Sequence, residues 1–229
     1  MNTSTSDIEV LDRLLAQRRS CRGFLPEQVP RETIEQWLHS SQRAASWCNT
    51  QPWQMVVTSG EATTRFRDEI VKRADAREPA QPDFPFPPEY QGVSLARRRE
   101  VGFALYESVG VARGDREASA RQARENFLLF GAPHVAILTT DASLGVYGAV
   151  DCGVYLGTLM LTAQALGLGL IAQAALARHP DFIRSHFGLS EDRRVVCGMS
   201  FGFPDRQHPA NAFRSRRAGL DEVVSWVGG

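Results

Sequence analysis

The chain has 229 residues, 43% hydrophobic and 23% charged, which excludes a disordered or collagen-like chain and fits one large or two small globular domains. Lysine plus arginine and aspartate plus glutamate each number 26, so the chain lacks the basic excess of a nonspecific nucleic-acid binder. Because no run of 18 apolar residues and no secretory signal is present, we expect a cytoplasmic protein that binds neither membranes nor nucleic acid.

The cysteines and histidines do not predict a metal site. Cys21, Cys48, Cys152 and Cys197 lie far apart with no C-x-x-C pair, and the five histidines form no H-x-x-x-H pair. We therefore expect free thiols, most of them filling small apolar gaps in a reducing compartment.

Helical and strand patterns alternate along the chain. Helical spacing or helix-start signals mark eight segments: Asp7–Gln17, Pro30–Leu38, Ser59 to about Arg73, Leu95–Val111, Glu117–Phe130, Gly145–Leu166, Pro180–Gly188 and a terminal helix ending in Trp226. Apolar or β-branched runs predict four strands: Gln54–Thr58, His134–Thr139, Gly169–Gln173 and Arg194–Phe201. Few strands and much helix predict an α+β fold, an α/β sandwich around one mixed central sheet.

A proline-rich stretch interrupts this alternation. Five prolines and three aromatic residues (Phe84, Phe86 and Tyr90) lie within residues 79–90, which we call the lid segment. So many prolines exclude a helix or a central strand, and the aromatic content is unusual for a solvated linker. The segment is either a linker between domains or an excursion that covers something.

The predicted helix Gly145–Leu166 carries a stripe of small residues. Ala149, Gly153 and Gly157 recur every four residues, so they share one face. Such a face allows another helix backbone to approach closely, either in the core or between subunits.

One motif suggests a serine hydrolase. Gly198–Gly202 (GMSFG) matches the G-x-S-x-G nucleophile elbow, with Ser200 as the nucleophile. The elbow must open a helix, however, and Pro204 follows almost at once. Only 29 residues remain to supply the acid and the histidine, so this alternative is disfavoured.

Arginines cluster near both ends of the chain. Arg18, Arg19 and Arg22 surround Ser20, and Arg214, Arg216 and Arg217 form a second group. Guanidinium groups bind phosphate in a bidentate manner, so the two groups suggest one small anionic ligand. Solvated surface patches are the alternative interpretation that spacing alone favours.

Five motifs in order resemble the FMN-dependent nitroreductase family, and in particular its nitrobenzoate and nitrophenol reductases. They are RRSCRGF (18–24), SWCNTQPW (46–53), ALGL (165–168), GFP (202–204) and RAGLDE (217–222). The resemblance implies a single FMN-binding domain over residues 1–229, a domain-exchanged homodimer with FMN between the subunits, and a lid insertion at about 75–125.

The resemblance also implies the site residues. Arg18, Arg19, Ser20 and Arg217 would hold the phosphate and ribityl chain, with Arg214 or Arg216 as alternatives in the second group, and Arg22 would lie near the pyrimidine edge of the flavin. Ser46, Trp47, Asn49 and Gln51 would come from the partner subunit, and Ala172, Gln173 and Ala174 would run beside the flavin. Cys48, Phe84, Phe86 and Tyr90 would line the substrate slot.

The implied reaction is two-electron reduction of nitroaromatic or quinone-like acceptors by a ping-pong mechanism, with NADH or NADPH as donor and no catalytic side chain assigned. The alternative within the same flavin chemistry is reductive dehalogenation of halogenated phenols. Enzymes of that branch grip an amino acid with glutamate, tyrosine and lysine in the lid. Here the lid holds Glu89 and Tyr90, but no lysine follows Lys72, which argues against this alternative.

Overall fold

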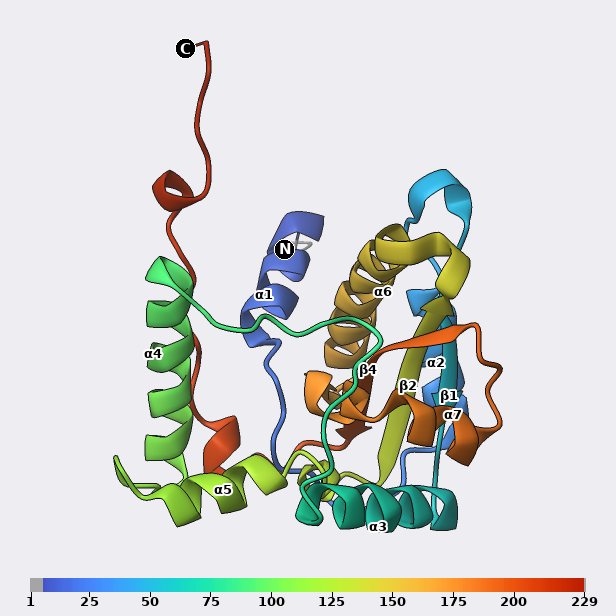
Figure 1. Cartoon of the computed structure of the whole chain (residues 1–229). Helices are drawn as coiled ribbons and strands as arrows, with labels where there is room; N and C mark the ends of the chain where they lie inside the picture. The colour runs from blue at the N-terminus through green and yellow to red at the C-terminus, as the bar shows by residue number, and fades with distance from the viewer. Residues whose placement is uncertain (1–5, 229) are drawn as a thin grey trace.

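A four-stranded sheet forms the centre of the structure, a computed structural model that describes residues 6–228 (Figure 1). Its strands are β1 (Gln54–Val57), β2 (His134–Asp141), β3 (Gly169–Gln173) and β4 (Arg193–Gly202), in the order β1-β2-β4-β3. Neighbouring strands pair antiparallel. The predicted sheet is mixed, but the pairs between the named strands are all antiparallel. A parallel pairing occurs at an isolated bridge between Ser20 and Leu170.

Helices cover both faces of this sheet. The α-helices are α1 (Asp7–Gln17), α2 (Arg31–Ser41), α3 (Glu61–Asp75), α4 (Gly92–Ser108), α5 (Arg116–Arg124), α6 (Gly145–Ala165) and α7 (Pro180–Phe187). Side chains of β2 alternate between two cores. Ile137 joins the core with α3 and α7, whereas Leu138 joins the core with α2 and α6. The α+β sandwich is therefore confirmed.

Two predicted helices are wrong in part. The helix predicted over Glu117–Phe130 ends at Arg124. A helix could not have reached Phe130, because Leu129 and Phe130 adopt positive φ angles of 58° and 53° that no right-handed helix contains. The predicted terminal helix is absent from the described residues, where only a 3₁₀ turn, Leu220–Glu222, forms. Trp226 is 86% exposed, so it meets no apolar surface within the chain that could stabilise a helix.

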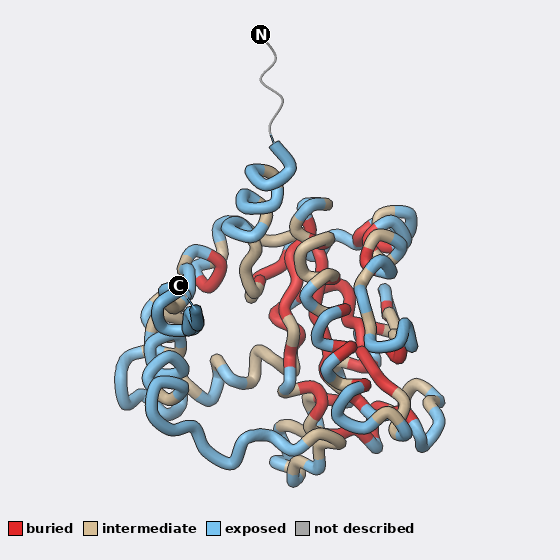
Figure 2. Tube along the Cα trace, turned by 90° about the horizontal axis from the view of Figure 1, so that it is seen from above, coloured by how far each residue is buried: buried red, intermediate tan, exposed pale blue. Residues whose placement is uncertain are grey.

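Several elements extend from the sheet and bury little within the chain. Helices α1 and α4 contain no buried residue, and Figure 2 shows the N-terminal helix and the C-terminal segment exposed along most of their length. Yet Ile8, Leu15, Phe103 and Val223 are large apolar residues exposed on these elements. Ile8, Leu11 and Leu15 share one face of α1, and a contiguous exposed apolar face is typical of a binding surface.

Helix α6 is the longest helix described and has two contrasting faces. Cys152, Tyr155, Leu159 and Ala163 are buried, and the helix contacts α2, β2 and β3. With the turn before it, Ala142–Ala165 is long and apolar enough to span a membrane by length and composition, but it also carries a buried carboxylate, Asp151, bonded to protein groups. We interpret it as a helix with one face in the core, whereas Val146, Val150 and Val154 are exposed on the rest of its surface.

Candidate functional site

Both arginine groups line one cavity of about 470 Å³, here called the arginine cavity. Its lining comprises Leu15, Ala16, Arg18, Arg19, Ser20, Arg22, Val101, Phe213, Arg214, Ser215 and Arg217. The two segments lie almost 200 residues apart in sequence, and the fold brings them together as predicted. Arg216 instead lines a neighbouring cleft beside α4, where its guanidinium lies 3.9 Å from the Glu100 carboxylate.

Two sets of hydrogen bonds position the first arginine group. The Cys21 amide donates to the Leu170 carbonyl (3.1 Å), so the segment after α1 runs beside β3. The Asn211 side chain accepts from the Arg22 amide (2.7 Å) and donates to the Gly23 carbonyl (2.8 Å). Asn211 is thus a clamp between the two arginine segments that the sequence did not reveal.

The electrostatics of the arginine cavity favour an anion. Partial burial, reinforced by the neighbouring charge of Arg217, lowers the pKa of Arg18, and burial with Arg214 nearby lowers the pKa of Arg19. Among the described residues the lining contains no carboxylate, and the buried Nε of Arg19 has no hydrogen-bond partner. A phosphate would relieve the mutual repulsion and accept from that nitrogen.

The end of β3 lies next to this segment. Ala172 is half-buried and Ala174 exposed, so their backbone is accessible from the side where the chain continues. The Gln173 side chain is buried instead, where it donates to the Asn126 carbonyl (2.7 Å) and accepts from the Ser200 hydroxyl (2.5 Å). Gln173 as a whole is 2% exposed, so its side chain is not available to a ligand.

The same contact removes the hydrolase alternative. Ser200 lies within β4, is fully buried and donates its hydroxyl proton to Gln173. Only short 3₁₀ turns follow β4 in the described residues, so the exposed strand-to-helix elbow that a nucleophilic serine needs does not form.

The second sequence motif forms a strained loop, residues 46–51. Cys48, Asn49 and Gln51 have positive φ angles of 50°, 55° and 47°. Of these three residue types only asparagine tolerates this region readily, and each such residue costs on the order of 1–2 kcal/mol. The loop must therefore be held by contacts from outside it.

Those contacts come from α6 and β4. The Asp151 carboxylate accepts from the Trp47 amide (3.0 Å) and the Thr50 hydroxyl (3.4 Å). The Trp47 and Tyr147 rings pack at 4.6 Å between centroids, and the buried Arg193 guanidinium donates to the Pro52 carbonyl (3.2 Å). Ser46 accepts from the Gln51 amide (3.0 Å) and closes the loop.

Within one chain this loop does not approach the arginine cavity. In Figure 1 the loop, in light blue, lies at the upper right end of α6, whereas α1, which leads into Arg18, lies on the other side of α6. The loop residues and the lining of the arginine cavity share no member. The two halves of the expected site are therefore separate in the chain.

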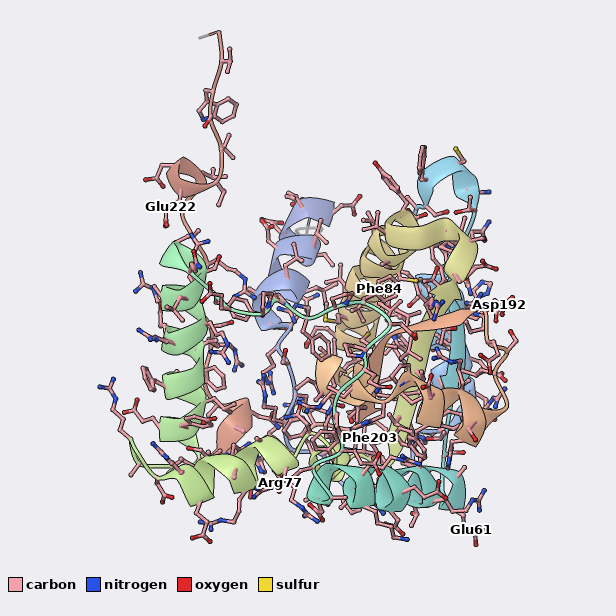
Figure 3. The ribbon with its side chains drawn as sticks, viewed as in Figure 1. Glu61, Arg77, Phe84, Asp192, Phe203 and Glu222 are labelled. Atoms are coloured by element: carbon pink, nitrogen blue, oxygen red, sulfur yellow. The ribbon has the colours of Figure 1, made fainter. Side chains whose placement is uncertain are left out.

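The lid segment is anchored at one end and open at the other. The Asp83 carboxylate, 4% exposed, accepts from Arg184 (2.7 Å), Arg194 (3.2 Å) and the Val195 amide (2.7 Å). Phe84, labelled in Figure 3, follows this anchor and is half-buried, whereas Phe86 and Tyr90 are exposed. None of the three aromatic residues lines the arginine cavity.

Sequence reasoning missed Asn211, Asp151, Arg193 and Asp83. Each of them contacts a residue more than 100 positions away in the sequence. Local sequence patterns cannot indicate contacts over such a separation. No group of three or more His, Cys, Asp or Glu side chains able to hold a metal occurs in residues 6–228.

Comparisons with known proteins agree on one family. The profile of the Nitroreductase family matches residues 15–203. Nitroreductase NfnB of Mycolicibacterium smegmatis is 37% identical over 94% of this chain and 92% of its own length, and a 4-nitrobenzoate reductase of Nocardioides is 30% identical over 96% and 91%. The crystal structure of the FMN-dependent nitroreductase NfnB from Mycobacterium smegmatis in complex with NADPH superposes with a TM-score of 0.91, at 34% identity over 97% of this chain and all of that one.

Proposed function

This chain belongs to the Nitroreductase family of oxidoreductases, and we propose that it binds FMN and passes electrons from NADPH or NADH to nitroaromatic acceptors in the cytoplasm. The observation that carries the proposal is the arginine cavity: two arginine segments converge on a space whose lining, among the described residues, includes no carboxylate, and the buried Nε of one lining residue, Arg19, has no hydrogen-bond partner. The relatives described as FMN-dependent, NADPH-bound or acting on 4-nitrobenzoate support the choice of cofactor, donor and acceptor.

We assign the phosphate to Arg18, Arg19, Ser20 and Arg217. These residues offer charge-assisted donors, and the Nε of Arg19 is the donor that lacks a partner. Arg214 also lines the arginine cavity, but its Nη1 donates to the carbonyls of Asn211, Ala212 and Phe213. We therefore give Arg214 the role of bracing the C-terminal segment as well as adding positive charge.

Bound FMN supplies two-electron transfer between a nicotinamide and an acceptor. We assign Arg22 to the electron-rich pyrimidine edge, because a guanidinium withdrawn from water stabilises negative charge more strongly. The backbone of Ala172, Gln173 and Ala174 would donate hydrogen bonds beside it, and the alanine methyl groups allow close approach. The charged side chains assigned to the flavin are arginines, which do not give up a proton at neutral pH. We therefore assign no side chain as general acid and expect water to supply the protons.

The second half of the site is assigned to a partner subunit. Three observations support a homodimer. The 46–51 loop is remote from the arginine cavity, and large apolar residues of α1 and α4 are exposed. A Cβ added to Gly153 or Gly157 also meets no atom within 4 Å. Small residues on an open helix face permit a close helix–helix contact. In this arrangement Ser46, Trp47, Asn49 and Gln51 of one subunit face the FMN held by the other.

The lid segment completes the substrate slot in this proposal. Phe84, Phe86 and Tyr90 would provide flat apolar walls for the nicotinamide and the nitroarene, with Cys48 opposite on the 46–51 loop. A shared slot gives ping-pong kinetics, since the oxidised nicotinamide must leave before the acceptor enters.

A binding experiment tests the cofactor assignment. The purified protein should carry about one FMN per subunit, and Arg18→Ala should weaken FMN binding about tenfold or more, because contacts to a charged group contribute about 1.5–3 kcal/mol. Arg31→Ala is the matched control, since Arg31 makes only an exposed pair with Glu35 on α2. Unchanged FMN affinity in Arg18→Ala would remove Arg18 from the site.

Complementation tests the shared site. Arg18→Ala and Asn49→Ala homodimers should both be impaired in NADPH-driven reduction of 4-nitrobenzoate. Mixed subunits would form heterodimers with one intact site, so random mixing should restore about a quarter of wild-type activity. Absence of any recovery in demonstrably mixed dimers would contradict the assignment of the 46–51 loop to the partner. Halide release from a halogenated phenol, without nitroarene reduction, would instead favour the dehalogenase.

A further inference from the structure

The 46–51 loop keeps an unfavourable backbone shape while its own side chains remain largely outside the core. Cys48, Asn49 and Gln51 lie in the left-handed region, and all three are exposed. Within the loop, the Gln51 side chain donates to the Asn49 carbonyl (3.3 Å) and side-chain oxygen (3.2 Å). These exposed contacts exchange readily with water, so they do not by themselves hold three left-handed residues.

A buried carboxylate lies directly beneath the loop. Asp151 projects from α6 and is 7% exposed. Its Oδ1 accepts from the Trp47 amide at 3.0 Å, and its Oδ2 accepts from the Thr50 hydroxyl at 3.4 Å. The Asp151 side chain therefore holds Trp47, before the strained Cys48–Asn49 pair, and Thr50, directly after it.

A carboxylate suits this position because burial makes its acceptor role strong. A backbone amide bonded to an ionised oxygen forms a charge-assisted hydrogen bond, about twice as strong as a neutral one. Tyr147, one turn earlier on α6, packs against the Trp47 ring, and Arg193 holds the carbonyl of Pro52 where the loop ends. Helix α6 and strand β4 thus position the loop from below and leave its upper side free.

We propose that Asp151 is a positioning residue: it preorganises the 46–51 loop so that Asn49 and Gln51 are presented in their binding geometry before FMN arrives. The inference rests on the proposed function, in which this loop faces the flavin of the partner subunit. A preordered loop lowers the conformational cost of binding, so loss of Asp151 weakens FMN affinity without touching the arginine cavity.

Hydrogen exchange measured by mass spectrometry on a peptide spanning residues 44–53 tests the proposal, in both the flavin-free and the FMN-saturated protein. In Asp151→Ala the amides of Trp47 and Gln51 should exchange about tenfold faster or more, because the loop opens locally. FMN affinity should fall by a similar factor, and the visible circular dichroism of the bound flavin should change. Asp151→Asn should recover part of the protection, since its amide oxygen still accepts from the Trp47 amide but without the charge that strengthens the bond.

Cys152→Ala is the matched control for simple destabilisation. Cys152 is the next residue on α6 and is fully buried, and its thiol donates to the Thr139 carbonyl (3.9 Å) rather than to the loop. The Cys152→Ala variant should have a lower melting temperature, but its hydrogen exchange in residues 44–53 and its FMN affinity should equal those of the wild type. If Asp151→Ala does not fold, Thr50→Val removes one of the two contacts with Asp151. This variant should accelerate exchange in residues 44–53 and weaken FMN binding, each by a smaller factor.

Two results would overturn the proposal. The first is a rate of hydrogen exchange in residues 44–53 that stays as in the wild type in Asp151→Ala or, if that variant does not fold, in Thr50→Val. The second is an exchange rate in Cys152→Ala that rises as much as in Asp151→Ala. A wild-type protein that binds no FMN would instead contradict the proposed function, and the exchange experiment on the flavin-free protein would still decide whether Asp151 orders the loop.

Discussion

Removal of the Asp83 carboxylate should cost the protein stability and release the lid segment. Asp83 is 4% exposed and accepts from Arg184, which is 11% exposed, from Arg194 and from the Val195 amide. Asp83→Ala leaves the buried Arg184 guanidinium with fewer acceptors and the Val195 amide with none. Breaking a buried ion pair from one side costs about 3–5 kcal/mol.

Two features of the site reduce that figure. Arg184 keeps Asp181 and the Arg193 carbonyl as acceptors, and Arg194 is 44% exposed and can turn to water. We therefore expect a loss of about 3 kcal/mol for Asp83→Ala, and about half of that for Asp83→Asn, which retains one acceptor oxygen. For a chain of this length each kcal/mol lowers Tm by about 2–4 °C, so Asp83→Ala should melt about 6–12 °C lower.

Calorimetry at fixed protein and FMN concentrations measures this difference, because bound ligand raises apparent stability. Asp181→Asn is the control: it pairs with the same Arg184 but is 80% exposed, so its loss should shift Tm by little. If the anchor also holds the lid segment in place, KM for nitroarenes should rise in Asp83→Ala while FMN affinity stays constant. A Tm within 1 °C of the wild type would refute the reasoning from burial.

Three further outcomes are expected. Gly153→Leu should shift sedimentation towards monomer with loss of FMN, because added bulk on the open face of α6 blocks a close partner helix; a flavin-loaded monomeric wild type would contradict this. Replacing Phe84 and Phe86 by alanine should raise KM for nitroarenes with FMN content intact, and unchanged KM values would make the lid segment only a structural excursion. Burial lowers the pKa of His134, whose Nε2 accepts from the Val29 amide, so the unfolded chain binds more protons than the folded one. Stability should therefore fall as pH drops through about 6.5. His134→Gln should flatten that dependence in melting curves from about pH 7.5 to about pH 5.5.

Local patterns predict the elements with a strong period. The span of α6 matches the predicted helix to within one residue, because small and apolar residues recur at helical spacing between Gly145 and Gly167. Pro180 at the first position and Gly188 in the left-handed region bound α7 as predicted. The strand order β1-β2-β4-β3 could not be derived in the same way, since it depends on pairings between residues far apart in sequence.

The sequence also predicts only the part of the candidate site that depends on local residue patterns. Arginine clustering around Ser20 was visible locally, and its convergence with Arg217 followed from the resemblance. The contacts that shape the loops were not visible. Asp151 lies on an otherwise apolar helix, where its isolated charge was the only available signal, and the left-handed angle at Cys48 has no residue preference behind it.

The proposed homodimer would account both for the exposed apolar residues of α1 and α4 and for the separation of the 46–51 loop from the arginine cavity. A monomer would leave the exposed apolar residues of α1 and α4 in water and the 46–51 loop away from the arginine cavity. A second copy that covers those faces would also bring its loop to the cavity, so the same contacts that bury apolar area would complete the binding site. Cofactor binding and association are then thermodynamically linked: FMN favours the dimer by as much as the dimer favours FMN. Dissociation by dilution should therefore release flavin, and added FMN should lower the protein concentration at which dimers form.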